Sequence, residues 1–202
     1  MRTAIVLAGG KSSRIGVDKG LVILNNKPLV AYVVERLEPV VDEVILVVGS
    51  QAQVVAYAGF GSRVIRDKIP GGTPLVGAYT GFMEASAEYA FLTAVDQPLL
   101  DPRIVELLFK EAGGHDAATP TWANGWVEPL HAVYKTKPSA SVGKRLIEAG
   151  DKKLSMILGT LRDVVHIPIN EVKALDPELR TFMDIDTSED LEKISCLLAK
   201  NR

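Results

Sequence analysis

The feature that most constrains the fold is the turn that follows the first apolar segment. Residues 3–8 form a short run, TAIVLA, that is typical of a buried parallel strand. The next residues, GGKSSRIGVDK at 9–19, begin with two glycines and contain four charged side chains. Glycine lets the backbone turn tightly and approach a ligand, and ligands of open α/β sheets bind at the carboxyl ends of strands. The segment therefore predicts an α/β sheet that binds a polyphosphate at this turn, where Arg14 and Lys19 supply positive charge.

This turn matches neither of the two common phosphate-binding motifs. A Walker A motif needs a glycine five residues before Gly10, but that position is Ile5, inside the predicted strand. A Rossmann fingerprint needs a second glycine two positions after the first, and Lys11 follows Gly10. We interpret the segment as a separate type of phosphate-binding turn. The alternative is an ordinary strand-to-helix turn with solvated charges.

Short apolar runs alternate with amphipathic stretches along the chain. This pattern predicts a three-layer α/β sandwich with a mostly parallel, Rossmann-like sheet. The predicted strands cover residues 3–8, 20–24, 43–48, 63–66, 89–95, 116–121, 129–135 and 163–168. The predicted helices cover residues 28–38, 51–57, 75–88, 102–112, 139–149, 154–161 and 187–200. We expect one domain over 1–202, with a nucleotide-binding half at 1–112 and an acceptor-binding half at 113–202.

Charge and composition narrow the choice of partners. The net charge is −2 and 24% of residues are charged, so no overall basic field indicates nucleic acid. The first apolar run is too short for a signal peptide or a membrane span. The single cysteine, Cys196, has no intrachain partner, which favours a reducing compartment. We therefore expect a cytoplasmic protein that binds neither nucleic acid nor membranes.

Acidic residues follow several of the predicted strands. Asp96 comes directly after the apolar strand 89–95, so its carboxylate should lie at the same sheet edge as the glycine turn. A carboxylate at this edge can hold Mg²⁺ against phosphate oxygens; the alternative is a cap of the following helix. Asp184 and Asp186 share one face if their segment is extended, and one of them could complete the metal shell. The alternative for both is stabilisation by the dipole of the last helix.

Two further residues leave several roles open. Asp67 ends the predicted strand 63–66, where it can bind a ribose hydroxyl, a base or part of a second substrate. A solvated turn is the alternative. His131 lies in an alternating apolar strand, which favours a structural histidine over a catalytic one.

The glycine turn is part of a longer pattern, LAGG-x-S-x-R-I-G-x-DK at 7–19, that resembles the signature of MobA-type molybdenum cofactor guanylyltransferases. These belong to the GT-A-like nucleotidyltransferase superfamily. The resemblance continues at Asp67, at VDQP (95–98), at EPL (128–130) and at DIDTSEDL (184–191). It implies the following nucleotide-binding set: Leu7, Ala8, Gly9, Gly10, Ser12, Arg14, Lys19, Asp67 and Asp96. It also places Mg²⁺ at Asp96, and the acceptor at Glu128 and Pro129.

Two positions depart from the family pattern. The family usually has Asn-x-Asn-Thr near the C-terminus, and this chain has Asp184-Ile185-Asp186-Thr187, which keeps the oxygen ligands and adds charge. A methionine after the motif arginine is replaced by Ile15. The related cytidylyl transferases look like Leu-Ala-Ala-Gly at the first turn, so Gly9 favours GTP over CTP.

The resemblance implies transfer of GMP from GTP to the terminal phosphate of molybdopterin cofactor, with release of pyrophosphate. Arg14, Lys19 and Asp96 would be the catalytic residues, and Mg²⁺ would be held by Asp96 with Asp184 or Asp186. We further expect transient contact with molybdoenzymes or cofactor-delivery proteins, and a monomer or weak homo-oligomer. The alternatives are another phosphorylated acceptor (a sugar phosphate, cobinamide phosphate or phospholactate), cytidylyl transfer, or a GTP-binding regulatory module without turnover.

Overall fold

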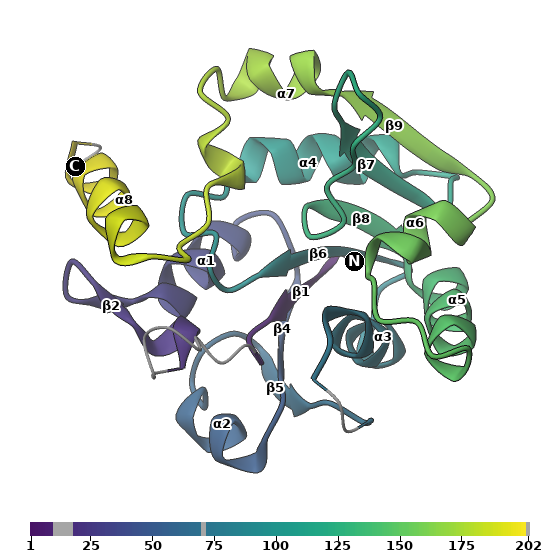
Figure 1. Cartoon of the computed structure of the whole chain (residues 1–202), viewed down its shortest axis with the longest axis horizontal. Coiled ribbons are helices and arrows are strands. Elements are labelled where there is room, and N and C mark those ends of the chain that lie inside the picture. Colours follow the sequence, from purple (N-terminus) through teal and green to yellow (C-terminus); the bar gives the residue numbers. More distant parts are fainter. Residues whose placement is uncertain (10–17, 70–71, 201–202) are drawn as a thin grey trace.

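A seven-stranded, mostly parallel sheet forms the centre of the protein, in the order β5-β4-β1-β6-β8-β7-β9 (Figure 1). The computed structural model describes residues 1–9, 18–69 and 72–200. The strands are β1 (Thr3–Leu7), β4 (Glu43–Val48), β5 (Arg63–Arg66), β6 (Tyr89–Ala94), β7 (Ala117–Thr121), β8 (Ala132–Lys135) and β9 (Val164–Pro168). Within this sheet β8 runs antiparallel to both of its neighbours. The predicted fold class is confirmed.

The parallel register brings the ends of three strands to one edge of the sheet. Leu7 at the end of β1 lies beside Val47 of β4 and Ala94 of β6. The residues that follow these strands, Gly9 and Asp96 among them, therefore meet at the carboxyl edge, as the sequence predicts.

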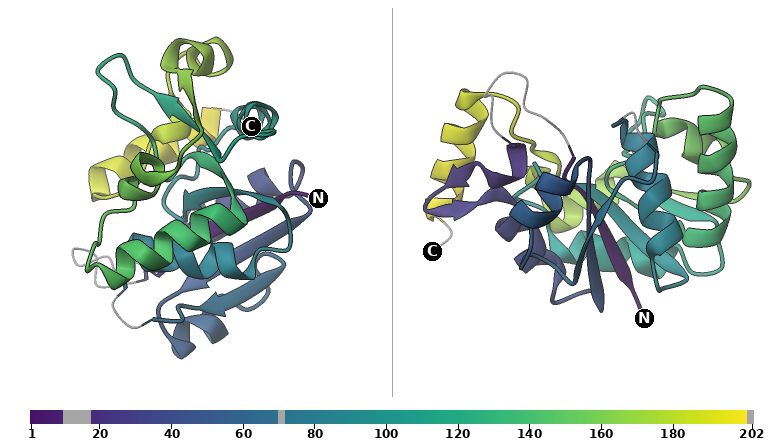
Figure 2. Two further views of the ribbon diagram at one scale, coloured as in Figure 1. Left: turned by 90° about the vertical axis from the view of Figure 1, so that its right-hand side faces the viewer. Right: turned by 90° about the horizontal axis from the view of Figure 1, so that it is seen from below.

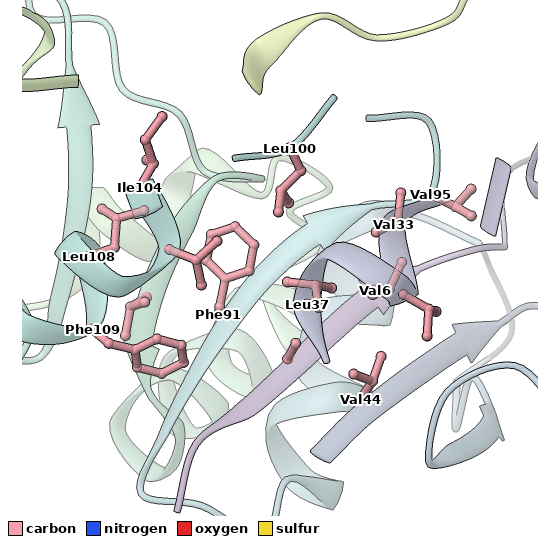
Figure 3. Packing of buried hydrophobic residues seen from close by; sticks show 14 of the residues in the cluster. Val6, Val33, Leu37, Val44, Phe91, Val95, Leu100, Ile104, Leu108 and Phe109 are labelled. Carbon is pink, nitrogen blue, oxygen red and sulfur yellow. The ribbon is translucent and has the colours of Figure 1, made fainter. Parts of the chain in front are cut away.

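Helices cover both faces of the sheet (Figure 2). The helices are α1 (Leu29–Leu37), α2 (Gln51–Ala56), α3 (Pro74–Glu84), α4 (Pro102–Glu111), α5 (Thr136–Glu148), α6 (Ser155–Thr160), α7 (Ile169–Leu175) and α8 (Ser188–Lys200). Because successive strand residues point to opposite faces, Val6 packs in the core under α1 and α4, and Ile5 in the core under α3 and α5. Figure 3 shows the first of these cores around Val6, Phe91 and Leu108.

Some predicted boundaries are wrong, for local reasons. Helix α3 ends at Glu84 rather than residue 88, because the Ser86 amide and hydroxyl donate to the Glu43 carboxylate at 3.2 and 3.1 Å. The predicted strand 129–135 begins only at Ala132, since Pro129 has no N–H to donate to a ladder. Helix α5 begins at Thr136, three residues early, with a proline tolerated in its first turn.

Two further differences concern short elements. The predicted strand 20–24 is a 3-10 turn, Lys19–Leu21, followed by the two-residue strand β2 (Ile23–Leu24), which pairs with β3 (Lys27–Pro28). Helix α7, which has only seven residues, was not predicted.

The C-terminal helix packs on the side of the molecule that carries β2 and β3 (Figure 1). The Ser195 hydroxyl donates to the Asn25 side chain at 2.7 Å, and Ile194 is buried beside Leu24 and Tyr32. Ile185 belongs to the same buried cluster. This packing holds the segment before α8 at the carboxyl edge of the sheet.

Within the described residues, 1–9, 18–69 and 72–200, we find no helix with the length and hydropathy that a membrane span requires.

A glycine at the centre of α3 permits close contact between this helix and β1. A Cβ atom at Gly81 would overlap Cγ2 of Ile5 and stand 3.1 Å from its Cδ1. We expect Gly81→Ala to lower the free energy of unfolding by about 1–3 kcal/mol, because overpacking outweighs the helix propensity of alanine. Gly159→Ala in α6 is the matched control: its Cβ would meet no atom within 4 Å. Urea unfolding of both variants tests this, and an unchanged midpoint for Gly81→Ala would contradict the packing argument.

Candidate active site

A cavity of about 200 Å³ opens at the carboxyl edge of the sheet. Five of the predicted site residues line it: Leu7, Gly9, Lys19, Asp67 and Asp96. The remaining walls come from the ends of β4 and β6, from the start of α3 and the residues just before it, and from Leu130, in the loop before β8. The cavity therefore combines the ends of several parallel strands with a loop from the second half of the chain.

The backbone of the first turn is tightly packed against the end of β4. The Ala8 amide donates to the carbonyl of Val47 at 2.8 Å, and the Ala8 side chain is fully buried. A Cβ atom at Gly9 would lie 3.1 Å from the amide nitrogen of Gly49. Glycine at position 9 is therefore a packing requirement as well as a way to bring the backbone close to a ligand.

Lys19 connects two acidic residues that are far apart in the sequence. Its ammonium lies 2.7 Å from Asp96 Oδ2 and 2.6 Å from Asp186 Oδ1, and its side chain is 15% exposed. Burial opposes the charge, but the hydrogen bonds to Asp186 and Asp96 outweigh it and raise the pKa of Lys19. The lysine is therefore a fixed positive charge in the lining of the cavity.

The segment that carries Asp186 is held in place by its backbone. The Ile185 amide donates to the carbonyl of Asp96 at 3.1 Å, and the Ile185 side chain is buried. Asp184 and Asp186 flank it and remain outside the core. Burial, followed by the charges of Asp186 and Asp96, raises the pKa of Asp184, so the three acids form one group.

The side chains that cap α4 and α8 are those of other residues, so the alternative role of Asp96 as a helix cap is wrong. The Thr187 amide donates to Asp190 Oδ2 at 2.9 Å and the Asp190 amide donates to Thr187 Oγ1 at 3.2 Å, which forms a capping box at α8. At α4 the cap is Asp101, whose side chain accepts from the Arg103 amide. Asp96 and Asp186 are therefore available to Lys19 or to a ligand.

The oxygen ligands at this edge fit a divalent cation such as Mg²⁺. Lys19 already places one positive charge between Asp96 and Asp186, and Mg²⁺ in nucleotide sites usually takes one or two carboxylates plus phosphate oxygens. Among the described residues no three acidic, histidine or cysteine side chains are arranged as a ready metal site. A metal here would therefore need oxygen atoms from a bound nucleotide.

Asp67 is not a solvated turn residue. Its amide donates to the carbonyl of Val48 at 2.8 Å, which fixes the residue at the end of β5. Its Oδ1 is buried and has no hydrogen-bond partner among the described residues. Burial raises the pKa of Asp67 to about 6. A buried acceptor without a partner indicates that a ligand donates to it.

Glu128 and Pro129 lie in the loop between β7 and β8. The Trp122 indole donates to the Glu128 carboxylate at 2.7 Å, and Trp122 packs on Phe182. Burial raises the pKa of Glu128, and so does the charge of Asp184. Pro129 lines a separate cavity of about 480 Å³ that meets the first one at Pro74 and Leu130. Their role in binding an acceptor stays a prediction.

Three predicted nucleotide-binding residues, Gly10, Ser12 and Arg14, lie outside the described residues.

The start of α3 is a part of the site that the sequence analysis did not assign. Thr73 caps the helix by accepting from the Val76 amide at 3.3 Å, and Pro74 occupies its first turn. A Cβ at Gly77 would lie 3.1 Å from Leu7 Cδ2 and 3.7 Å from Asp67 Oδ1. In the sequence, Thr73 followed by Pro74 indicates this helix start, because a capping residue followed by proline is typical of the first turn of a helix.

His131 is a buried structural histidine. It is 0% exposed, and its Nε2 lies 3.0 Å from Thr181 Oγ1. Its ring makes edge contacts with Phe91 and Phe182. Burial lowers the pKa of His131 to about 3.

The low pKa of His131 predicts a loss of stability in acid. The unfolded chain binds a proton at this residue near its ordinary pKa of 6.5, and the folded chain does so only near 3. The contribution of neutral His131 to the free energy of unfolding is therefore fully present above pH 6.5. It decreases by about 1.4 kcal/mol per pH unit as the pH falls below this value. Urea unfolding between about pH 6 and 4 gives the number of protons that the chain takes up when it unfolds. His131→Gln should take up about one proton fewer than the parent. An identical slope in the two proteins would contradict the assignment.

Comparison with known proteins places this site in a family. The model of the MobA-like NTP transferase domain matches residues 4–164. A probable molybdenum cofactor guanylyltransferase from Methanosarcina mazei is 41% identical over 201 residues, covering 96% of this chain and 89% of the relative. A protein of the same name from Natronomonas pharaonis is 38% identical, over 95% of this chain and 96% of its own length.

The solved structures agree with the sequence relatives. The crystal structure of molybdopterin-guanine dinucleotide biosynthesis protein A from Archaeoglobus fulgidus is 29% identical and superposes with a TM-score of 0.84, over 99% of this chain and 100% of the other. The family model covers most of the chain, and the relatives extend over nearly all of it. The chain therefore belongs to the family of MobA-like NTP transferases.

Proposed function

We propose that this protein transfers GMP from GTP to the terminal phosphate of molybdopterin cofactor and releases pyrophosphate. The observation that carries the proposal is the lysine between two carboxylates in a cavity that is also lined by Asp67, whose buried Oδ1 has no partner among the described residues. Such a site offers positive charge for a triphosphate and a hydrogen-bond acceptor for a nucleoside. The names of the relatives supply the base and the acceptor.

The acceptor phosphate is already an anion, so the reaction needs no strong general base. An oxygen of this phosphate attacks the α-phosphorus in line, the bond to the pyrophosphate oxygen breaks, and pyrophosphate leaves. Catalysis then depends on positioning and on charge neutralisation. Lys19 neutralises the triphosphate and the charge that develops on pyrophosphate. Arg14, which the structure does not describe, has the same role by its place in the glycine turn.

Asp96 and Asp186 are the residues that would hold Mg²⁺, and Asp184 supports them. When bound there, Mg²⁺ would neutralise phosphate oxygens and orient the leaving group. The Lys19 ammonium has three N–H donors, so it would keep Asp96 and Asp186 as partners and donate its third hydrogen to a phosphate oxygen.

We assign Asp67 to the base of the nucleotide, since guanine presents two N–H groups to a carboxylate. Asp67→Asn is expected to weaken GTP binding by about 10- to 100-fold and ATP binding by much less. Because the pKa of Asp67 is about 6, GTP affinity of the parent should also fall by about tenfold between pH 7 and 5. Titration calorimetry with both nucleotides measures this, and equal losses for GTP and ATP would assign Asp67 to the ribose instead.

Glu128 and Pro129 are assigned to the acceptor, and Pro129 lines the second cavity, which adjoins the first at Leu130. GTP and molybdopterin are then the substrates. Transient contact with cofactor-delivery proteins or molybdoenzymes, and a monomeric or weakly associating chain, complete the proposal.

Pyrophosphate release with GTP, CTP or ATP, each with and without the cofactor, tests the proposed function. Release with GTP alone, and only with the cofactor and Mg²⁺, is the expected result. Release with a sugar phosphate in place of the cofactor would support a different acceptor. Tight GTP binding without any release would support a regulatory module.

A further inference from the structure

Asp18 does not line the cavity, and its carboxylate is hydrogen-bonded to two other side chains of the protein. It accepts from the hydroxyl of Tyr57 and, at 2.5 Å, from Nε2 of Gln53. Asp18 precedes the 3-10 turn in the position of a cap, but its side chain caps no amide there. Its two side-chain hydrogen bonds therefore serve another purpose than helix capping.

Both donors come from α2 and its end, which are themselves fixed. Gln53 Oε1 accepts from the Gly49 amide at 3.0 Å, which ties this side chain to the end of β4. Tyr57 directly follows α2 and is fully buried. Burial and the neighbouring Asp18 raise the pKa of Tyr57, so its hydroxyl keeps its proton and remains a donor.

Gly20, the residue after Lys19, has no room for a side chain. A Cβ atom at this position would overlap the Tyr57 hydroxyl and stand 2.7 Å from Val95 Cγ2. Lys19 thus lies between Asp18, which is hydrogen-bonded to α2, and Gly20, which is wedged between Tyr57 and the end of β6. Its backbone has little freedom, and its ammonium reaches Asp96 and Asp186 from a fixed point.

We propose that Tyr57, with Gln53, is a positioning residue: through Asp18 it fixes the backbone that presents the Lys19 ammonium to the triphosphate. This inference rests on the proposed function for the identity of the nucleotide, but the position of Lys19 can be measured without it. Neither Tyr57 nor Gln53 lines the cavity, so neither contacts a ligand that is bound there.

The first test measures the reactivity of Lys19 in the protein without nucleotide. Competitive acetylation with acetic anhydride, followed by peptide mass spectrometry, gives the reactivity of each lysine, with exposed Lys68 as the internal reference. Tyr57→Phe should raise the relative reactivity of Lys19 about threefold or more, because the ammonium leaves its two carboxylates more often. Asp18→Asn, which keeps the tyrosine, should do the same. Tyr89→Phe is the matched control, since Tyr89 also donates a hydrogen bond, to the carbonyl of His115, and lies at the start of β6, the end opposite to Asp96.

The second test is a double-mutant cycle on GTP affinity, measured by calorimetry. Tyr57→Phe should weaken binding by about 5- to 10-fold when Lys19 is present, and by less than about twofold in a Lys19→Met background. Equal losses in both backgrounds, with Lys19 reactivity unchanged, would show that Tyr57 has only a structural role and would overturn the proposal. If the parent protein does not bind GTP, but Tyr57→Phe still raises the relative reactivity of Lys19, the proposed function is refuted and the positioning role is supported.

Discussion

Lys19→Met is expected to reduce the rate of GTP-dependent pyrophosphate release by about 100- to 1,000-fold. Methionine keeps most of the unbranched side chain and removes the charged end, so the loss reports on electrostatics more than on packing. In the parent the ammonium is largely buried and held between Asp96 and Asp186. A charge fixed in this way needs little reorganisation when the leaving pyrophosphate gains negative charge.

The matched control for this variant is Lys68→Met. Lys68 also pairs with a carboxylate, that of Glu84 at 2.6 Å, but it is exposed and lies outside the cavity lining. Its loss should leave turnover within about twofold of the parent, because exposed ion pairs contribute little. A Lys19→Met protein that is folded by circular dichroism and turns over at the parental rate would remove the lysine from the mechanism.

Asp96→Asn should lower turnover by about 1,000-fold and raise the Mg²⁺ concentration needed for half-maximal rate. The amide keeps an oxygen in place but loses the charge that a divalent cation requires. It also deprives Lys19 of one partner, while Asp186 still holds the ammonium at 2.6 Å. Turnover measured across a Mg²⁺ series separates the two consequences, since excess metal should restore part of the rate only if Asp96 is a ligand.

Asp42→Asn provides the comparison for this charge removal. Asp42 accepts from the Arg2 amide at 2.7 Å, near the amino end of the sheet. It should show parental turnover at every Mg²⁺ concentration. If Asp96→Asn behaves in the same way, Asp96 holds no metal.

The sheet could be predicted because buried parallel strands leave continuous apolar runs in the sequence. The runs at 3–8, 43–48 and 89–95 agree with β1, β4 and β6 within a residue. The rule that ligands bind at the carboxyl edge then brings Lys19 near Asp96 without any knowledge of the structure. The early end of α3 escaped the same reasoning, because the Ser86–Glu43 contact joins positions that are distant in the sequence.

The site could be predicted only in part, for a similar reason. The contact of Lys19 with Asp186 joins residues 167 positions apart, and it depends on how α8 packs beside β2 and β3. Local spacing carries no information about such packing. The hydrogen bonds of Asp18 are a second case, since Tyr57 reads as an ordinary residue at the end of a helix. Both depend on tertiary contacts between elements that sequence patterns predict one at a time.

The central claim is that this protein joins a guanylyl group to the acceptor phosphate, and the most direct measurement follows the α-phosphate itself. Incubation with GTP labelled at the α-phosphorus, molybdopterin cofactor and Mg²⁺ should move the label into a product whose mass is that of the cofactor plus GMP less one water. Pyrophosphate should appear in equal amount. Label that stays in GTP, or that appears only as free GMP, would contradict the claim.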